Sequence, residues 1–138
     1  MNWTTIWAAA SAIFTLCTAI IAFWAMLRWR KQEELKVKLS FKESIANYSF
    51  QLMQMPNLLV GPALREQCTE QAIQLNKLLS ACNNAWYLCE GLLEDNHAVN
   101  TAWDFIFNHN KEYLRGTLNS DDLGAMCMAI LHEKFVFD

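Results

Sequence analysis

The sequence predicts an all-α protein: a single N-terminal transmembrane helix followed by a small cytoplasmic helical bundle of about four helices. Two observations predict this fold. The 25 residues from Trp3 to Leu27 contain no charged side chain, and every Lys and Arg lies after them. Beyond that run, apolar residues recur at the three- and four-residue steps of amphipathic helices. We therefore expect residues 1–30 to form a membrane anchor with a basic collar, and residues 31–138 to form a cytoplasmic α-helical domain.

The uncharged run is long enough to cross a bilayer. As a helix it measures about 38 Å at about 1.5 Å per residue, whereas a hydrocarbon core of ~30 Å needs about 20 residues. Tryptophans stand near both ends, and the indole ring, with its apolar body and single N–H donor, favours the head-group level. With the basic residues that follow, they form the set that we expect to contact lipid head groups: Trp3, Trp7, Trp24, Arg28, Trp29, Arg30 and Lys31.

A buried core helix and a cleaved signal peptide are the alternatives for this run. Two tryptophan belts at a membrane-like separation are hard to explain in a core helix. A signal peptide would start with basic residues and end at a small-residue cleavage site. Here no Lys or Arg precedes the run, and MLRWRKQEE follows it. We therefore expect the segment to stay attached.

The charge distribution predicts the orientation of the span. Because Lys and Arg collect on the cytoplasmic side, the basic residues after Leu27 place the C-terminal domain in the cytoplasm and the N-terminus outside a cell (inner) membrane. The cysteines agree with a reducing compartment, since there are five and no two are spaced as C-x-x-C. We expect free thiols on helix faces at Cys68, Cys82, Cys89 and Cys127.

The segment after the collar is expected to continue the membrane helix. Five apolar residues recur at steps of four and three: Phe41, Ile45, Tyr48, Leu52 and Met55. A competing strand pattern covers residues 35–41, where apolar residues alternate with lysine and serine, and only KFVFD at the C-terminus offers it a partner. We favour the helix and expect it to end at the break marked by Pro56, Gly61 and Pro62.

A long helix is expected next, over Pro62 to Leu93, with Asn83 and Asn84 as the point where it can kink. Its apolar stripe consists of Leu64, Cys68, Leu75, Leu78, Cys82, Trp86, Cys89 and Leu93. Gly91 lies near its stop.

Two shorter helices complete the predicted bundle. Asp95 or Asn96 caps the first, and Gly116 ends it. Asn119 or Ser120 caps the second. The apolar positions of the two helices are Val99, Trp103, Ile106, Tyr113 and Leu114, then Leu123, Met126, Ile130 and Leu131. Most of the large aromatic side chains are expected to fill the core: Trp86, Trp103, Phe105, Phe107 and Tyr113.

Charge is divided unevenly along the chain. Residues 28–42 carry six basic and two acidic side chains, a net charge of +4, and residues 43–138 carry five basic and twelve acidic ones, a net charge of −7. The basic collar attracts anionic lipid, by about 1 kcal/mol per Lys or Arg. The acidic domain repels nucleic acid. We therefore expect the lipid bilayer as a partner and no nucleic acid.

Signs of catalytic chemistry are few. The adjacent carboxylates Glu33–Glu34 and Asp121–Asp122 point about 100° apart on a helix, so neither pair forms one site. Cys82 and Cys89 share a helix face, but no His pair and no Cys pair has the spacing typical of zinc sites. No glycine-rich phosphate loop or nucleophile motif occurs. We expect no cofactor, no metal site, no evident small-molecule substrate and no enzyme.

The membrane helix carries the most specific pattern. Small residues recur at steps of four and three within about 40° of one face: Thr4, Ala8, Ala12, Thr15, Ala19 and Ala22. Larger residues occupy another side, with Ile13 and Ile20 among them. Small residues let two helix backbones approach closely in lipid, and threonine hydroxyls can hydrogen-bond across the pair. This face is our candidate packing site. The alternative is that Ala and Thr are simply common in membrane helices. Small residues are not confined to this face, since Ser11, Thr18 and Ala25 lie on other sides of the helix.

Three functional hypotheses follow. The leading one is a single-pass, membrane-anchored interaction protein that self-associates, as a homo-oligomer, or serves as the accessory subunit of a membrane-associated complex with a membrane partner protein. The second is a membrane-perturbing oligomeric effector of the toxin or phage-defence type, in which the small face lines a pore. The third, a membrane-tethered enzyme, lacks a motif to support it.

Overall fold

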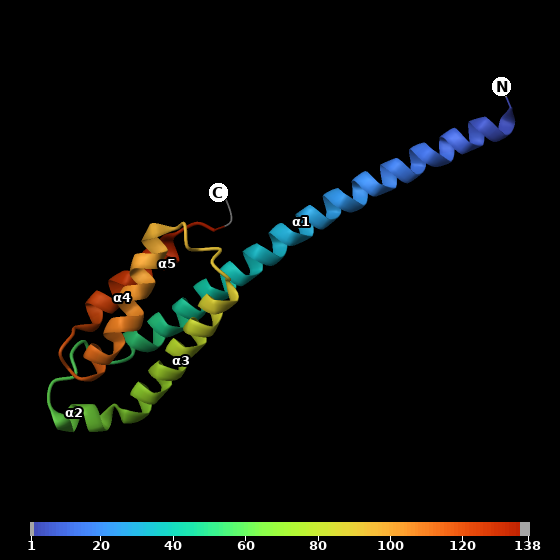
Figure 1. The fold of residues 1–138 in the computed structure, drawn as a ribbon. Helices are drawn as coiled ribbons and strands as arrows, with labels where there is room; N and C mark the ends of the chain where they lie inside the picture. Colours follow the sequence, from blue (N-terminus) through green and yellow to red (C-terminus); the bar gives the residue numbers. More distant parts are fainter. Residues whose placement is uncertain (1, 136–138) are drawn as a thin grey trace. The chain divides into compact units, whose positions relative to one another are not determined.

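A computed structural model describes residues 2–135 of the 138-residue chain. The described residues form five helices and no strand, which confirms the predicted all-α class. The helices are α1 (Trp3–Met53), α2 (Pro62–Gln67), α3 (Thr69–Leu88), α4 (His97–Leu114) and α5 (Ser120–His132) (Figure 1). Internal contacts divide the chain into two compact units, Met1–Glu34 and Leu35–Asp138, and the boundary falls inside α1. We call them the span unit and the bundle unit.

The segment whose secondary structure was ambiguous, residues 35–41, is helical and belongs to α1. The helix prediction is therefore confirmed and the strand alternative is wrong. Burial gives the reason: steps of four and three put Phe41, Ile45 and Tyr48 on one face with no exposed surface. Strand alternation would instead have buried Leu39, which is 40% exposed. The last three residues of KFVFD, the proposed partner strand, lie outside the described residues.

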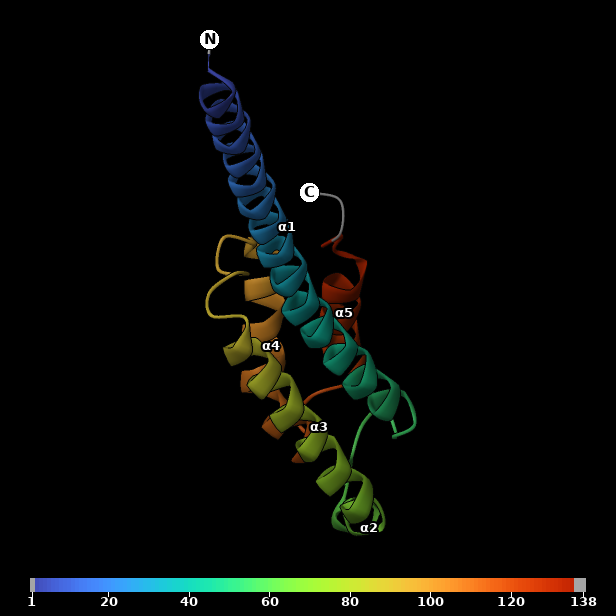
Figure 2. The same cartoon turned by 90° about the vertical axis from the view of Figure 1, so that its right-hand side faces the viewer.

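The part of α1 from Leu35 onward is the central helix of the bundle unit. The Phe41 ring lies 5.2 Å from the Trp86 ring of α3 and 5.5 Å from the Trp103 ring of α4, centroid to centroid. Directly after α5, the backbone oxygen of Glu133 accepts a hydrogen bond of 2.6 Å from the Lys42 ammonium. Figures 1 and 2 show α3, α4 and α5 beside this part of α1. It thus contacts α3, α4 and the segment after α5, while α4 and α5 also pack directly on each other.

The single helix expected over Pro62–Leu93 is two helices, which corrects the prediction. The break lies at Cys68, not at Asn83 and Asn84, which remain inside α3. At the break, the Thr69 hydroxyl donates to the backbone oxygens of Arg65 and Glu66, at 3.2 and 2.8 Å, and so adds side-chain hydrogen bonds to the end of α2. Helix α3 ends at Leu88, yet Cys89 and Leu93 stay buried in the turn that follows.

The predicted helix ends are confirmed where polar caps and glycine decide them. Side-chain oxygens of Asn96 and Asn119 accept hydrogen bonds from the first-turn N–H groups of α4 and α5. Gly116, at φ +81°, ends α4 in a Schellman motif: its N–H donates to the Tyr113 oxygen and the Thr117 N–H donates to the Glu112 oxygen, both at 3.0 Å. A Cβ on Gly116 would lie 2.1 Å from the backbone oxygen of Leu59, so this glycine also permits a close approach.

Most of the aromatic residues predicted for the core do pack in it or against it. Trp103 and Tyr113 are buried, and Trp86 and Phe105 are half-buried, but Phe107 is 46% exposed. Phe107 contacts Trp103, at 5.7 Å between ring centroids, from the solvent side of α4. A polar chain also reaches into the interior from Asn76, which is exposed. The Tyr48 hydroxyl donates to the Asn110 side-chain oxygen at 2.6 Å, and the Asn110 amide donates to the Asn76 side-chain oxygen at 3.0 Å.

Candidate functional site

Among the described residues, one helix contains a stretch long and apolar enough to cross a membrane, and it lies near the N-terminus, in α1. From Asn2 to Glu34 every side chain is exposed except Ala10, which is half-buried. The exposed side chains include Phe14, at 75%, and Ile21, at 65%. Soluble proteins rarely expose so much continuous apolar surface to water, so this surface requires an apolar solvent or an apolar partner.

The predicted packing face overlaps a shallow, open groove along the span unit. The groove is lined by Ala8, Ser11, Ala12, Thr15, Leu16 and Ala19, four of which belong to the predicted face. The other two predicted members, Thr4 and Ala22, are exposed on the same helix outside the groove lining. The groove exists because short side chains leave the backbone uncovered between longer neighbours.

The hydroxyl of Thr15 is already used within the helix. It donates to the Ser11 backbone oxygen at 2.9 Å, and Thr18 makes the same kind of bond to the Phe14 oxygen at 2.8 Å. Across a helix pair, the Thr15 hydroxyl can therefore act only as a hydrogen-bond acceptor, because its proton is already donated to Ser11.

Three basic residues of the collar, Arg28, Arg30 and Lys31, are exposed. With Trp24, Leu27 and Glu34 they line an open hollow of about 470 Å³. The Arg28 guanidinium carbon lies 5.6 Å from the centre of the Trp24 ring, which is a cation–π contact. Trp3, Trp7 and Trp29 are also largely exposed. This chemistry, an aromatic ring beside several cations, suits the boundary between acyl chains and phosphate groups.

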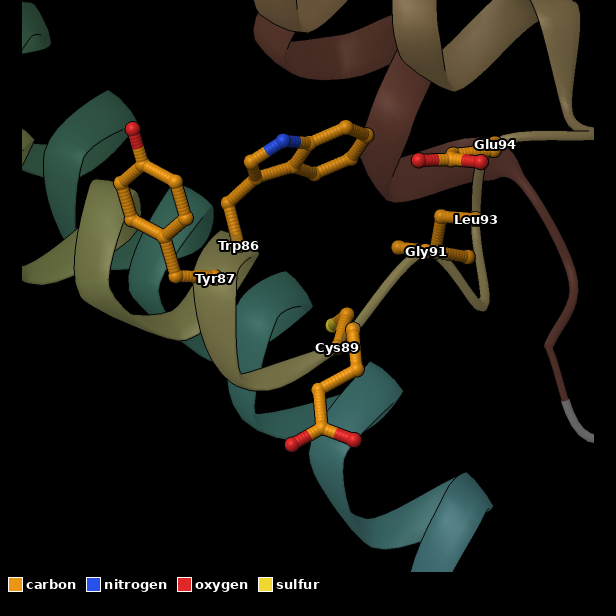
Figure 3. A pocket seen from close by; sticks show the side chains of 7 residues that line it. Trp86, Tyr87, Cys89, Gly91, Leu93 and Glu94 are labelled. Atoms are coloured by element: carbon orange, nitrogen blue, oxygen red, sulfur yellow. The ribbon is translucent and has the colours of Figure 1, made fainter.

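A second hollow, of about 180 Å³, lies in the bundle unit where α3 ends (Figure 3). Its walls are Trp86, Tyr87, Cys89, Glu90, Gly91, Leu93 and Glu94. Periodicity in the sequence assigns several of these residues to the core stripe and to a helix stop, and it does not reveal the hollow. No sequence signal points to it, because it depends on a left-handed backbone at Glu90, φ 48°, as well as at Gly91, φ 82°.

Four cysteines are free and buried: Cys68, Cys82, Cys89 and Cys127. Cys82 and Cys127 lie on helix faces as predicted, whereas Cys68 and Cys89 lie at helix ends. Burial raises the pKa of the Cys82 and Cys127 thiols from 9.0 to about 12, so both stay protonated at neutral pH. Burial also raises the pKa of Cys89, and nearby Lys38 opposes that shift in part. Within residues 2–135, no three Cys, His, Asp or Glu side chains gather as metal ligands.

Comparisons with protein-family models, with curated proteins and with solved structures find no match to this chain. Its function is therefore inferred from its own residues.

Proposed function

We propose that this chain is a single-pass membrane protein whose N-terminus lies outside the cell (inner) membrane and whose bundle unit is cytoplasmic. It acts as an interaction protein that self-associates through its span, or that holds a partner subunit there. The observation that carries this proposal is the groove along the exposed span helix, lined by Ala8, Ala12, Thr15 and Ala19. An apolar helix with no protein cover and one face of short side chains suits lipid on most sides and another helix on that face.

The orientation is supported by charge. Six basic side chains lie in residues 28–42, and none precedes Arg28. Retention of Lys and Arg in the cytoplasm orients such a span with its C-terminal side inside. A reporter fused to the C-terminus is expected to show cytoplasmic activity and to sediment with inner membranes through an alkaline wash. Periplasmic phosphatase activity from the same fusion, or release by the wash, would contradict the proposal.

Self-association is tested by adding bulk to the groove. Replacing Ala12 and Ala19 by Leu keeps the span apolar and helical, so insertion should survive. The added side chains separate two packed backbones, and overfilled contacts cost about 1–3 kcal/mol, or roughly 5- to 150-fold in association. A membrane two-hybrid assay or cross-linking in membranes measures the loss. The matched control replaces Ile13 and Ile20 by Leu on the lipid-facing side, where association should be unchanged.

Equal association of both variants and the parent would contradict packing through this face. The span would then be an anchor, and partner binding would lie in the bundle unit. Depolarisation of cells on expression, abolished by the Ala variant and kept by the Ile variant, would instead favour the membrane-perturbing effector.

A further inference from the structure

The small hollow at the end of α3 combines an aromatic wall with carboxylates. Its volume of about 180 Å³ is below the roughly 300–1,000 Å³ of sites that enclose drug-sized ligands. It can therefore take only a small group or the end of a longer molecule. Trp86, Cys89 and Leu93 make the hollow apolar, whereas Glu90 and Glu94 make it negative.

The aromatic wall is held in place by packing. The centroid of the Trp86 ring lies 5.2 Å from that of Phe41 and 6.0 Å from that of Trp103, and both neighbours are buried. Because its inner side is fixed in this way, the half-buried indole has little freedom to close the hollow. Its π-face carries the negative part of the ring quadrupole, which attracts cations.

The opposite wall is shaped by the backbone. Gly91 has a positive φ, and the Glu94 carboxylate folds back over it: the carboxyl carbon and oxygens lie 3.1, 3.2 and 3.4 Å from the place of a Gly91 Cβ. Figure 3 shows the Glu94 carboxylate on the side of Trp86 that faces away from Tyr87. Glu90 is held at φ 48°, a conformation that costs a non-glycine residue free energy. This turn therefore keeps a carboxylate beside the indole.

The chemistry of these walls indicates the charge and the kind of ligand that the hollow can bind. A metal ion needs several hard or thiolate ligands, and the described residues offer no group of three. An organic ammonium group fits both walls, because its carbons contact the indole while its charge meets the carboxylate. The Lys38 ammonium lies close enough to Cys89 to act on its thiol, but Lys38 lines the adjacent hollow with Asp95 and His97.

We propose that this hollow binds the ammonium group of a small organic amine, either free or as the head group of an aminophospholipid. The lipid source rests on the proposed membrane location. The Cys89 thiol donates to the Val37 backbone oxygen at 3.6 Å, and Val37 is six residues after Lys31 of the collar. This wall of the hollow is therefore bonded to the part of α1 that follows the collar along the chain.

The test uses the full chain in nonionic detergent micelles, with its six tryptophan indole N–H signals followed by NMR. The signal missing from Trp86→Phe identifies Trp86. Titration with ethylammonium chloride should shift that signal saturably, whereas sodium chloride should not. Glu94→Gln should weaken the binding about tenfold, since it removes one charge-assisted contact. The matched control is Glu66→Gln, an exposed carboxylate on α2, which should bind like the parent.

Three results would overturn the proposal: no saturable shift with the amine, the same shift with sodium, or equal weakening by both Gln variants. Circular dichroism confirms that each variant is folded. Reconstitution separates the two sources of the amine. If the lipid head group is the ligand, adding phosphatidylethanolamine to phosphatidylglycerol vesicles weakens ethylammonium binding about tenfold; if not, the free amine is the ligand. The detergent titration needs no membrane insertion. It therefore tests the ammonium site even if the fusion experiment contradicts the proposed topology.

Discussion

The two parts of α1 have the same secondary structure and opposite surroundings. From Trp3 to Glu34 no described side chain is buried, although the run from Trp3 to Leu27 is the most apolar part of the chain. From Leu35 to Met53 five side chains are buried, and the exposed side carries charged and polar residues together with Leu39, Phe50 and Met53. The first part hides its apolar surface only if lipid or another helix covers it, whereas the second part buries much of its apolar surface within its own unit.

This difference shows what stabilises each part. In the span, every backbone hydrogen bond is made within the helix, so the helix persists wherever water is absent. In the bundle unit, a helix is stable because its face packs on α3, α4 and the segment after α5. Treatments that disturb packing should therefore act on the bundle unit and spare the span.

Alkaline pH should give the largest effect. Thiols and phenols ionise in the unfolded chain near pKa 9.0 and 10.0, but burial raises the pKa of Cys82, Cys127 and Tyr113 to about 12. The folded unit therefore holds more protons than the unfolded chain above pH 9, and its stability falls as pH rises. Below about pH 9 these protonated groups contribute their whole stabilising effect. We expect the bundle unit to unfold as the pH rises from about 9 to about 12.

Circular dichroism of the full chain in detergent measures this transition. Near-UV signals from the packed aromatic rings should vanish in that window, while far-UV helicity should fall only in part because the span stays helical. Near-UV signals that persist to about pH 12 would contradict the role assigned to the buried thiols and phenols.

Gly116→Ala should give the next largest effect. Alanine at φ +81° is strained by about 1–3 kcal/mol, and its Cβ would meet the Leu59 oxygen, so the free energy of unfolding should drop by about 2–5 kcal/mol. Chemical unfolding followed by near-UV circular dichroism measures the change.

Gly124→Ala is the matched control: Gly124 lies inside α5, and no atom lies within 4 Å of the place that an added Cβ would take. Its replacement should stabilise the unit by about 0.5–1 kcal/mol. Equal effects would mean that the turn at Gly116 can shift.

The caps, the helical faces and the span were predictable because each depends on residues close in sequence. Asn96, Asn119 and Gly116 act on the adjacent helical turn, and the positions of Phe41 and Tyr48 follow from helical steps. The break at Cys68 and the hydrogen bond between Tyr48 and Asn110 were not predictable. Both depend on which helices pack together, and that is not set by residues close in sequence. The residues around a buried asparagine also show no sequence pattern that differs from those around an exposed one.

The hollow beside Trp86 was missed for the same reason. Sequence periodicity places Trp86 on the core stripe, but it does not reveal the left-handed turn that folds Glu94 back over Gly91. The small face of the span was predictable as a pattern, because on an isolated helix the groove follows from side-chain size alone.

Tyr48→Phe should have a moderate effect. It removes the donor to the Asn110 side-chain oxygen and leaves that buried acceptor unpaired, which costs about 1–3 kcal/mol of unfolding free energy. Tyr87→Phe is the matched control, because Tyr87 is 71% exposed and its change should stay within about 0.5 kcal/mol. The same unfolding assay applies to both. Similar losses in the two variants would show that the polar chain does not contribute to stability.

Removal of the span should have the smallest effect. Internal contacts separate Met1–Glu34 from Leu35–Asp138, and the buried side chains of α1 begin at Phe41. A chain that starts at Glu33 keeps all of them, so it should be soluble and unfold within about 0.5 kcal/mol of the bundle unit in the full chain. Helix fraying at the new N-terminus affects the first turn, in which only Leu35 packs, half-buried, against the core. If residues 33–138 fail to give a cooperative unfolding transition, the bundle depends on the preceding part of α1, and the two parts of that helix are one folding unit.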